Sequence, residues 1–502
     1  MPLLPLRIPP GVYRNGTEYQ SAGRWYDANG IRWFEGVTRP IGGWIDLTLT
    51  PTAFTSATVD LPGVPRCAVS YRTLTNTPWL VVGTHTKLYA YSAGELYDIT
   101  PAAFVVGDPD ATVAGSLSGY GSSVYGGGLY GAGNAAVLDI PPTTWQLDAF
   151  GNFLVGVQTK DGRLFSWASD SGVDAVVVAG APTQNAAVVT TPERFVFALG
   201  ANNNVKRVQW PSQETLTDWT PTPSNSAGFL DLETNGRLIC GRASRQQTLL
   251  WTDVDMHAAQ YIGGDLVYSF SLLGENCGTV GPNAVAMDNG VAFWMGPRGF
   301  FLYDGFVKPV SCEVSDYVFG SFNVQQRAKV FAVAEPQYGE IWWFYPSSES
   351  TENDRYVVYN YREGHWSIGR LARTAGVSRG TFPSPIYFAP DGRGYEHEVG
   401  TLRPGMTPWA QSGPVELTPG DQTFMVRRVI PDERTLGETK TRLFARLHPT
   451  DAETSSAPLA VRSPTDVRLS GRQFSMRVTE NVPNTDWRVG TFRLDVALRG
   501  SR

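Results

Sequence analysis

Two pairs of acidic residues in this 502-residue chain have the spacing of catalytic carboxylates. Asp253 and Asp255 stand two residues apart, and the segment 352–354 begins with Glu and ends with Asp. Paired carboxylates serve as the acid and the nucleophile or base of glycoside hydrolases. Such pairs also arise at turns by chance, and the chain has no S-x-D-x-G-x-T-W repeat, G-x-S-x-G elbow, H-E-x-x-H motif or cysteine–histidine signature. We therefore predict that the protein is not an enzyme.

Residues with metal-binding chemistry are few. His397 lies between Glu396 and Glu398, but successive side chains of a strand point to opposite faces, so the histidine would face away from both carboxylates. The four cysteines have no C-x-x-C spacing, which argues against a zinc site and a dense disulfide framework; they are Cys67, Cys240, Cys277 and Cys312. We expect reduced thiols, no bound metal and no cofactor.

A stretch near the N-terminus, GRWYDANGIRWFEGVTRPIGGW from 23 to 44, combines aromatic rings with cations. Its candidate site residues are Arg24, Trp25, Arg32, Trp33, Arg39 and Trp44. Such side chains stack on sugars or bases, or they anchor one segment of protein against another. Asp27, Glu35 and Asp46 lie beside the arginines, so the basic balance of a nucleic-acid site is missing. We favour an arm that packs its tryptophans against the rest of the chain or a neighbouring subunit, with its arginines paired to carboxylates or carbonyls.

The elements that position these residues are short apolar and aromatic runs, each followed by a turn. The runs are 42 to 54 residues apart except for one interval of 74, and they begin at Trp79, Phe153, Phe195, Leu249, Ala292, Ile341 and Ile386. Four-stranded antiparallel sheets that repeat around an axis have periods of about 40 to 50 residues. Together with 53 Gly, 35 Pro and 12% aromatic residues, the pattern predicts an all-β fold with a β-propeller of about five to seven blades.

The longest interval contains a Gly- and Tyr-rich insertion, SGYGSSVYGGGLYGAG from 118 to 133. It has neither the glycine spacing nor the lysine of a phosphate-binding loop. Tyr120, Tyr125 and Tyr130 are five residues apart on a segment too rich in glycine to fold alone. Two interpretations remain open: a loop that narrows the mouth of a channel, or an insertion on the outer rim of a blade.

The character of the chain changes after Gly400. The segment 401–502 has 15 basic and 11 acidic residues, against 26 and 36 in the first 400. Its strands alternate apolar and polar residues, with two inward-facing sets, Phe474, Met476 and Val478, and Phe492, Leu494, Val496 and Leu498. We predict three parts: an N-terminal aromatic and Arg-rich arm (1–44), a propeller (45–404), and a C-terminal antiparallel β-sandwich or barrel with Arg-rich outer faces (405–502).

The bulk charge and the N-terminus limit the partners and the location. A net charge of −6 argues against a protein whose main task is to grip nucleic-acid phosphates. The N-terminus has early prolines and no signal-peptide pattern, and no run approaches 18 apolar residues. We expect a soluble protein that is made in the cytoplasm and does not insert into a membrane.

Several strings, together with the Gly/Tyr insertion, carry a resemblance to a known family. They are the segment 23–44, LYDITP (96–101), WQLDAFGNFLVG (145–156), NCGTVGPNAV (276–285), EIWWFYPSS (340–348) and TDWRVGTFRLDVALRGSR (485–502). The pattern covers nearly the whole chain and resembles the bacteriophage tail nozzle or tail tubular proteins, also called packaged-DNA stabilisation or tail accessory proteins. No single motif among these strings encodes an activity.

The resemblance implies a virion structural protein that forms a homohexameric ring around a DNA channel, each subunit a propeller with an attached β platform. The ring would join portal or adaptor proteins, carry tail fibres or spikes, retain packaged DNA, and let double-stranded DNA pass transiently without sequence-specific contacts. Its location would be the virion tail, after synthesis in the host cytoplasm. The alternative is a carbohydrate-binding or carbohydrate-cleaving propeller at the host surface, suggested by the surplus of 15 Trp and 21 Tyr.

Overall fold

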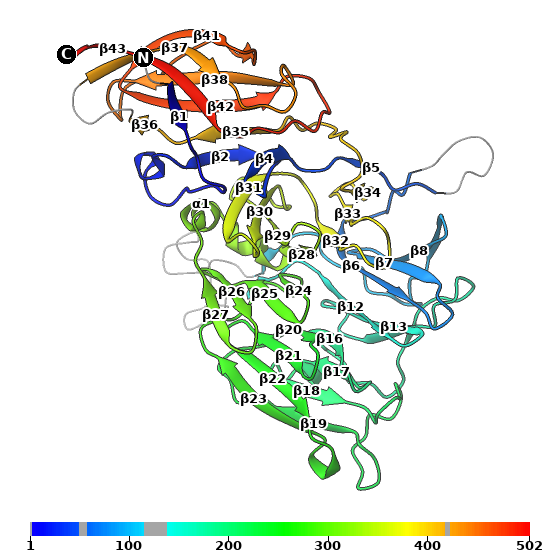
Figure 1. Ribbon diagram of the computed structural model, residues 1–502. Coiled ribbons are helices and arrows are strands. Elements are labelled where there is room, and N and C mark those ends of the chain that lie inside the picture. Colours follow the sequence, from blue (N-terminus) through cyan, green and yellow to red (C-terminus); the bar gives the residue numbers. More distant parts are fainter. Residues whose placement is uncertain (1–2, 50–57, 115–137, 417–421, 502) are drawn as a thin grey trace, which may run out of the picture.

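Seven four-stranded antiparallel sheets follow one another around an axis in the computed structural model of the chain (Figure 1). The structure describes residues 3–49, 58–114, 138–416 and 422–501. Within these residues the protein is a seven-bladed β-propeller joined to a second, C-terminal β domain. The predicted fold class is therefore confirmed, with the blade number at the upper end of the expected range.

Each blade is a meander whose first strand lies nearest the axis. Blade 1 comprises β6 (Pro65–Arg72), β7 (Pro78–Thr84), β8 (Leu88–Ser92) and β9 (Glu95–Asp98). Blade 2 comprises β12 (Trp145–Phe150), β13 (Phe153–Gln158), β14 (Leu164–Trp167) and β15 (Val176–Val177). Blade 3 comprises β16 (Ala187–Thr190), β17 (Val196–Leu199), β18 (Arg207–Trp210) and β19 (Gly228–Asp231). Blade 4 comprises β20 (Leu238–Ala243), β21 (Thr248–Thr252), β22 (Met256–Tyr261) and β23 (Tyr268–Gly274).

The remaining blades follow the same plan. Blade 5 comprises β24 (Val285–Asp288), β25 (Val291–Met295), β26 (Phe300–Tyr303) and β27 (Val307–Val310). Blade 6 comprises β28 (Phe331–Glu335), β29 (Glu340–Tyr345), β30 (Arg355–Asn360) and β31 (His365–Arg370). Blade 7 comprises β32 (Ala375–Val377), β33 (Ile386–Phe388), β34 (Gly394–His397) and β5 (Trp44–Asp46).

The seven runs that predicted the repeat are the second strands of the seven blades. Each run begins within that strand or, for Phe195, one residue before it. These strands are buried on both faces, so their sequences are nearly continuous apolar runs, as in β29. The interval of 74 residues is long because an extra hairpin of β10 (Thr112–Ala114) and β11 (Leu138–Ile140) separates blades 1 and 2.

Helix is scarce in the described part of the chain. It consists of α1 (Ser315–Gly320) and the 3-10 segments η1 (Glu18–Ser21), η2 (Ala201–Asn203), η3 (Gly264–Leu266) and η4 (Val324–Lys329). Of these, α1 and η4 connect blades 5 and 6.

The ring is closed by a strand from near the start of the chain. β5 is the outermost strand of blade 7, where Trp44 pairs with His397 and Asp46 with Tyr395. The other three strands of this blade follow residue 374. Blade 7 is therefore incomplete until two distant segments meet.

The C-terminal part, which we call the platform domain, contains two antiparallel sheets. The first is ordered β1 (Leu3–Leu6), β43 (Phe492–Ser501), β37 (Gln422–Ile430) and β41 (Thr465–Gly471). The second is ordered β2 (Trp25–Asn29), β35 (Trp409–Ser412), β42 (Gln473–Glu480), β38 (Thr439–Arg446) and β39 (Thr454–Ser455), with β36 (Val415–Glu416) on β42 and β40 (Leu459–Ala460) on β38. The residues expected to face inward are buried except Leu498, which is 64% exposed near the end of β43.

The N-terminal segment is not a separate arm, because β1 and β2 belong to the sheets of the platform domain and β5 to blade 7. β1 pairs with β43 and β2 with β35. The hairpin of β3 (Ile31–Phe34) and β4 (Val37–Pro40) follows, and β2 and β3 both contact β31 at the rim of blade 6 (Figure 1). One apolar core runs from blades 5 and 6 through this segment into the platform domain. Blades 5 and 6 and the platform domain therefore share one continuous apolar core.

Candidate functional site

The three tryptophans of the segment 23–44 are buried within the chain. Trp25 and Trp33 are 3% and 1% exposed, and their ring centroids lie 6.0 Å apart in the core shared by blade 6 and the platform domain. Trp44 is also buried, and its ring stacks on that of His397 at 5.2 Å in blade 7. The rings thus pack against this chain itself, and a role in anchoring a neighbouring subunit stays a prediction.

Two of the three arginines of this segment form ion pairs near the surface. Arg24 Nη2 lies 2.6 Å from Glu313 Oε2, in the connection that leads to α1. Arg39 Nη2 lies 3.2 Å from Asp486 Oδ1 of the platform domain. Both side chains retain some exposure to solvent, so each pair contributes only modestly to stability.

Arg32 is different, because its side chain is only 1% exposed and it holds two buried carboxylates. Its Nε and Nη2 donate to the two oxygens of Glu340 at 2.8 and 2.9 Å. Its Nη1 and Nη2 donate to Glu398 at 3.0 and 2.9 Å. The guanidinium also stands 3.6 Å from the centre of the Tyr338 ring. Arg32 therefore joins the N-terminal hairpin to blade 6 and to the end of blade 7.

A further carboxylate, Glu335 at the end of β28, lies beside this cluster. Its Oε1 is 2.9 Å from Arg379 Nε, whereas its Oε2 is buried without a hydrogen-bond partner. Burial raises the pKa of Glu335 to about 7; the Glu398 carboxylate acts in the same direction, against the attraction of Arg379 and Arg32. The folded protein thus keeps a proton on Glu335 at pH values where the unfolded chain, with a pKa of about 4.3, has released it.

We expect Glu335→Gln to stabilise the protein at pH 8 but not at pH 4. Because the folded pKa is the higher one, the carboxyl group lowers the stability progressively as the pH rises from about 4 to about 7. At pH 8 the substitution should raise the free energy of unfolding by roughly 1 to 3 kcal/mol, because the amide carries no charge. Urea denaturation at pH 4, 6 and 8 measures this, with Asp391→Asn at an exposed pair as the control. A stability difference that does not change with pH would contradict the prediction.

The propeller encloses a cavity on its axis. Its volume is about 390 Å³, and residues of all seven innermost strands line it, from β6, β12, β16, β20, β24, β28 and β32. The lining is mostly small and apolar, and its polar side chains are Arg66, Ser70, Gln146, Asp148, Arg242, Asn283 and Ser378. Burial raises the pKa of Asp148, although its carboxylate accepts hydrogen bonds from two backbone amides.

A layer of hydrogen bonds crosses the propeller axis and blocks the central channel at one end of this cavity. Gln146 Nε2 of blade 2 donates to Asn283 Oδ1, just before blade 5, at 2.6 Å. Arg242 of blade 4 donates to Gln146 Oε1 at 2.9 Å and to the Pro282 carbonyl at 3.1 Å. Asn283 Nδ2 in turn donates to the carbonyl of Arg66 in blade 1 at 3.0 Å. Blades 1, 2, 4 and 5 are thus bonded to one another across the axis.

A network of ion pairs around two buried cations holds the residues that precede β10 against blade 1 and η4. Lys329 Nζ lies 2.6 Å from Asp110 Oδ1 and 2.9 Å from Glu352 Oε1. Arg66 Nη1 lies 2.7 Å from Glu352 Oε2. Both cations have side chains at most 1% exposed, so the two carboxylates are needed to neutralise them.

The described residues on either side of the insertion lie near blade 5 and η4, whereas the insertion itself (118–133) lies outside the described residues. Ala111 and Ile140, one on each side of it, line a cavity of about 400 Å³ together with Pro282. Tyr120, Tyr125 and Tyr130 themselves lie outside the described residues. Whether they narrow a channel stays a prediction.

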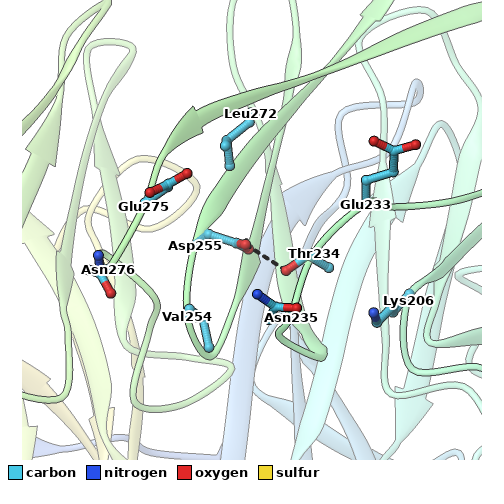
Figure 2. A pocket seen from close by; sticks show the side chains of 9 residues that line it. All are labelled: Lys206, Glu233, Thr234, Asn235, Val254, Asp255, Leu272, Glu275 and Asn276. Carbon is cyan, nitrogen blue, oxygen red and sulfur yellow. Dashed lines mark hydrogen bonds between the residues drawn. The ribbon is translucent and has the colours of Figure 1, made fainter.

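A third cavity, of about 380 Å³, forms a notch between blades 3 and 4 and is lined by several polar groups. In Figure 2, Glu233 and Glu275 lie on opposite sides of Asp255. The Asp255 carboxylate accepts hydrogen bonds from Thr234 Oγ1 at 2.6 Å and Thr252 Oγ1 at 2.5 Å. Within the described ranges no group of three His, Cys, Asp or Glu residues is arranged to hold a metal ion.

The carboxylate pairs singled out in the sequence are engaged in structural contacts. Asp253 pairs with Arg237 at 3.3 Å, and Asp255 is bonded to two threonines as described above. Glu352 belongs to the ion network, and Asp354 accepts hydrogen bonds from the amide and hydroxyl of Ser347 at 2.7 and 2.8 Å.

The contacts of His397 and the cysteines are structural as well. Arg373 Nε lies 3.0 Å from His397 Nε2, and burial, reinforced by the Arg373 charge, lowers the pKa of the imidazole well below its usual range. All four cysteines are free thiols, and burial raises the pKa of Cys67 and Cys240 to about 11. None of the helices in the described residues has the length and apolar character needed to cross a membrane.

Similar solved structures are propellers of other kinds. Streptogramin B lyase has a TM-score of 0.40 at 10% identity, over 70% of this chain and 98% of its own. BamB from Moraxella catarrhalis has a TM-score of 0.38 at 9% identity, over 74% and 93%. A luciferin-regenerating enzyme has a TM-score of 0.32 at 12% identity, over 50% and 89%. No protein-family model and no curated protein matches the chain.

These similarities correct one prediction. Two of the three proteins are enzymes by name, a lyase and a luciferin-regenerating enzyme, which points against the prediction that this chain is not an enzyme. It rested on missing motifs, and catalytic groups that several blades contribute together leave no local motif. At such low identity the similarities extend to the fold alone and assign no reaction to this chain.

Proposed function

We propose that the protein is a structural subunit of a phage tail, a ring-forming nozzle component that retains packaged DNA, conducts it on ejection and attaches other tail parts. The observation that carries the proposal is the core shared by the propeller and the platform domain. Domains move relative to one another unless their interface is large and apolar, and a ring that holds DNA under load needs subunits that do not deform. The strings that resemble the family supply this core, with Trp33 from 23–44, Trp343 from 340–348 and Trp487 from 485–502.

The closed axis limits where a DNA channel would lie. Gln146, Arg242 and Asn283 are hydrogen-bonded across the axis, and the major groove of a duplex alone is about 12 Å wide. DNA therefore does not pass through one propeller. In our proposal the conduit is the space enclosed by a homohexamer in the virion tail, which binds portal or adaptor proteins at one end and fibres or spikes around it.

Labelling of the subunit in particles tests the proposal. An epitope inserted at Leu74, an 81% exposed residue at the tip of the β6–β7 hairpin, should leave the fold intact. We expect gold-conjugated antibody to mark the tail of tagged phage particles in electron micrographs, with untagged particles as the control. Absence of the chain from purified particles would overturn the proposal.

A further inference from the structure

A cleft of about 420 Å³ lies at the junction of the propeller and the platform domain, away from the axis. This volume is within the usual range of small-molecule sites. One wall belongs to the N-terminal segment and the platform domain, the other to blade 6 and α1 (Figure 1). The lining residues that carry charge or a ring are Arg14, Asp27, Tyr317, Arg355, Arg370 and Trp409. We call this site the junction cleft.

The junction cleft contains more positive than negative charge. Arg14 Nη1 pairs with Asp27 Oδ1 at 2.8 Å, which neutralises one of its three arginines. Arg370 is exposed and has no ion pair within the described residues, where its backbone amide donates to Asn29 Oδ1 at 2.8 Å. With Asp27 as its single carboxylate, the lining has a net charge of +2.

Arg355 is the least solvated of these cations. Its side chain is 11% exposed; Nη1 donates to Ser321 Oγ at 3.0 Å, and Nε is buried without a hydrogen-bond partner. The nearest carboxylate, Asp354, is 3.9 Å from Nε and also accepts two hydrogen bonds from Ser347. A cation removed from water and only weakly paired favours the arrival of an anion.

Two aromatic rings are fixed beside these cations. Arg14 and Arg355 stand over the same ring, that of Tyr317, at 4.2 and 5.5 Å from its centre. Trp409 pairs with Asn29 across β35 and β2, and Arg477 stands 4.4 Å from the centre of its indole ring. The junction cleft thus combines fixed rings with an excess of guanidinium groups.

We propose that the junction cleft binds a phosphate monoester carried on a ring, as in a sugar phosphate or a nucleoside monophosphate. A phosphate monoester has a charge of about −1.5 to −2 near pH 7, which matches the net charge of the lining, whereas one carboxylate supplies half of it. Guanidinium forks bind phosphate oxygens in pairs, and the part of the Trp409 ring that lines the cleft suits a sugar or a base. The site does not depend on the tail function proposed above.

Isothermal titration of the full-length protein with glucose 6-phosphate and with AMP tests the proposal. We expect at least one of them to bind, and Arg370→Gln to weaken that binding roughly tenfold or more. Arg370 contacts its neighbours through its backbone amide, so this variant should melt like the parent. Arg298→Gln removes another exposed arginine, from the β25–β26 turn, and serves as the matched control.

Two further comparisons identify the ligand class. Trp409→Leu should weaken binding of the ring-bearing phosphate while inorganic phosphate still competes for the site. Binding of glucose 6-phosphate alone would indicate a sugar phosphate, and binding of AMP alone a nucleotide. The proposal is overturned if neither compound binds at 5 mM, if Arg370→Gln binds like Arg298→Gln, or if a tetraglutamate peptide binds where the phosphates do not.

Discussion

Trp33→Ala should lower the free energy of unfolding by about 3 to 5 kcal/mol, the usual cost of truncating a buried Trp. The indole is 1% exposed and lies between Trp25 and His365, at centroid distances of 6.0 and 6.3 Å. A cavity of about 60 Å³ already borders the ring, so the truncation would enlarge an existing defect in the shared core. Urea denaturation followed by circular dichroism measures the loss.

Two variants separate packing from other effects at this position. Trp33→Phe should lose much less stability, because Trp33 Nε1 makes no hydrogen bond and only volume is removed. Phe306→Ala, at a side chain that is 77% exposed, should leave the unfolding curve unchanged. If Trp33→Ala unfolds like the parent, the segment does not anchor the two domains and a ligand-facing role must be considered again.

Arg32→Met should destabilise the protein by a similar amount, about 3 to 5 kcal/mol, because it leaves two buried carboxylates without their cation. Glu340 is 4% and Glu398 11% exposed, and each accepts two hydrogen bonds from Arg32. Without the guanidinium, no cation compensates the burial of the ionised forms of these two side chains. The loss should therefore be larger at pH 8 than at pH 5, as measured by chemical denaturation at both values.

A compensated variant shows whether charge is the cause. Arg32→Met combined with Glu340→Gln and Glu398→Gln removes the uncompensated charges and should recover most of the stability. Arg298→Met, at an exposed turn, controls for loss of a single cation. Equal instability of the single and triple variants would attribute the effect to the Tyr338 contact and to packing, and not to charge.

The propeller was predictable because each blade repeats one strong signal. The second strand of every blade is covered on both sides, so runs such as those at Phe153 and Ile341 are almost wholly apolar and recur at the period of a blade. The closure of blade 7 was not predictable, because β5 is three residues long and its partner β34 lies about 350 residues away. The separate arm was wrong for the same reason: β1 and β2 complete sheets whose other strands come from the C-terminal part.

The candidate sites were predictable only in part. The spacing of Arg and Trp in 23–44 pointed to packing and ion pairs, but it did not identify Glu340 or Glu398 as the partners of Arg32. The layer that closes the axis combines Gln146 and Arg242 with a third blade, and neither residue stands out in its own strand. Arrangements that arise only when a ring closes leave no local pattern to read.

The closure of blade 7 has a consequence for synthesis on the ribosome. At roughly 5 to 20 residues per second, roughly 20 to 70 s separate the addition of Trp44 from that of its partner His397. Trp25 and Trp33 wait longer still, because the strands that cover them in the platform domain are translated last. Trp25 and Trp33 therefore stay unburied during almost the whole of translation. We expect chaperones to bind the nascent chain during this time. Once strands from both ends of the chain have paired in complete sheets, no terminal blade can detach by itself.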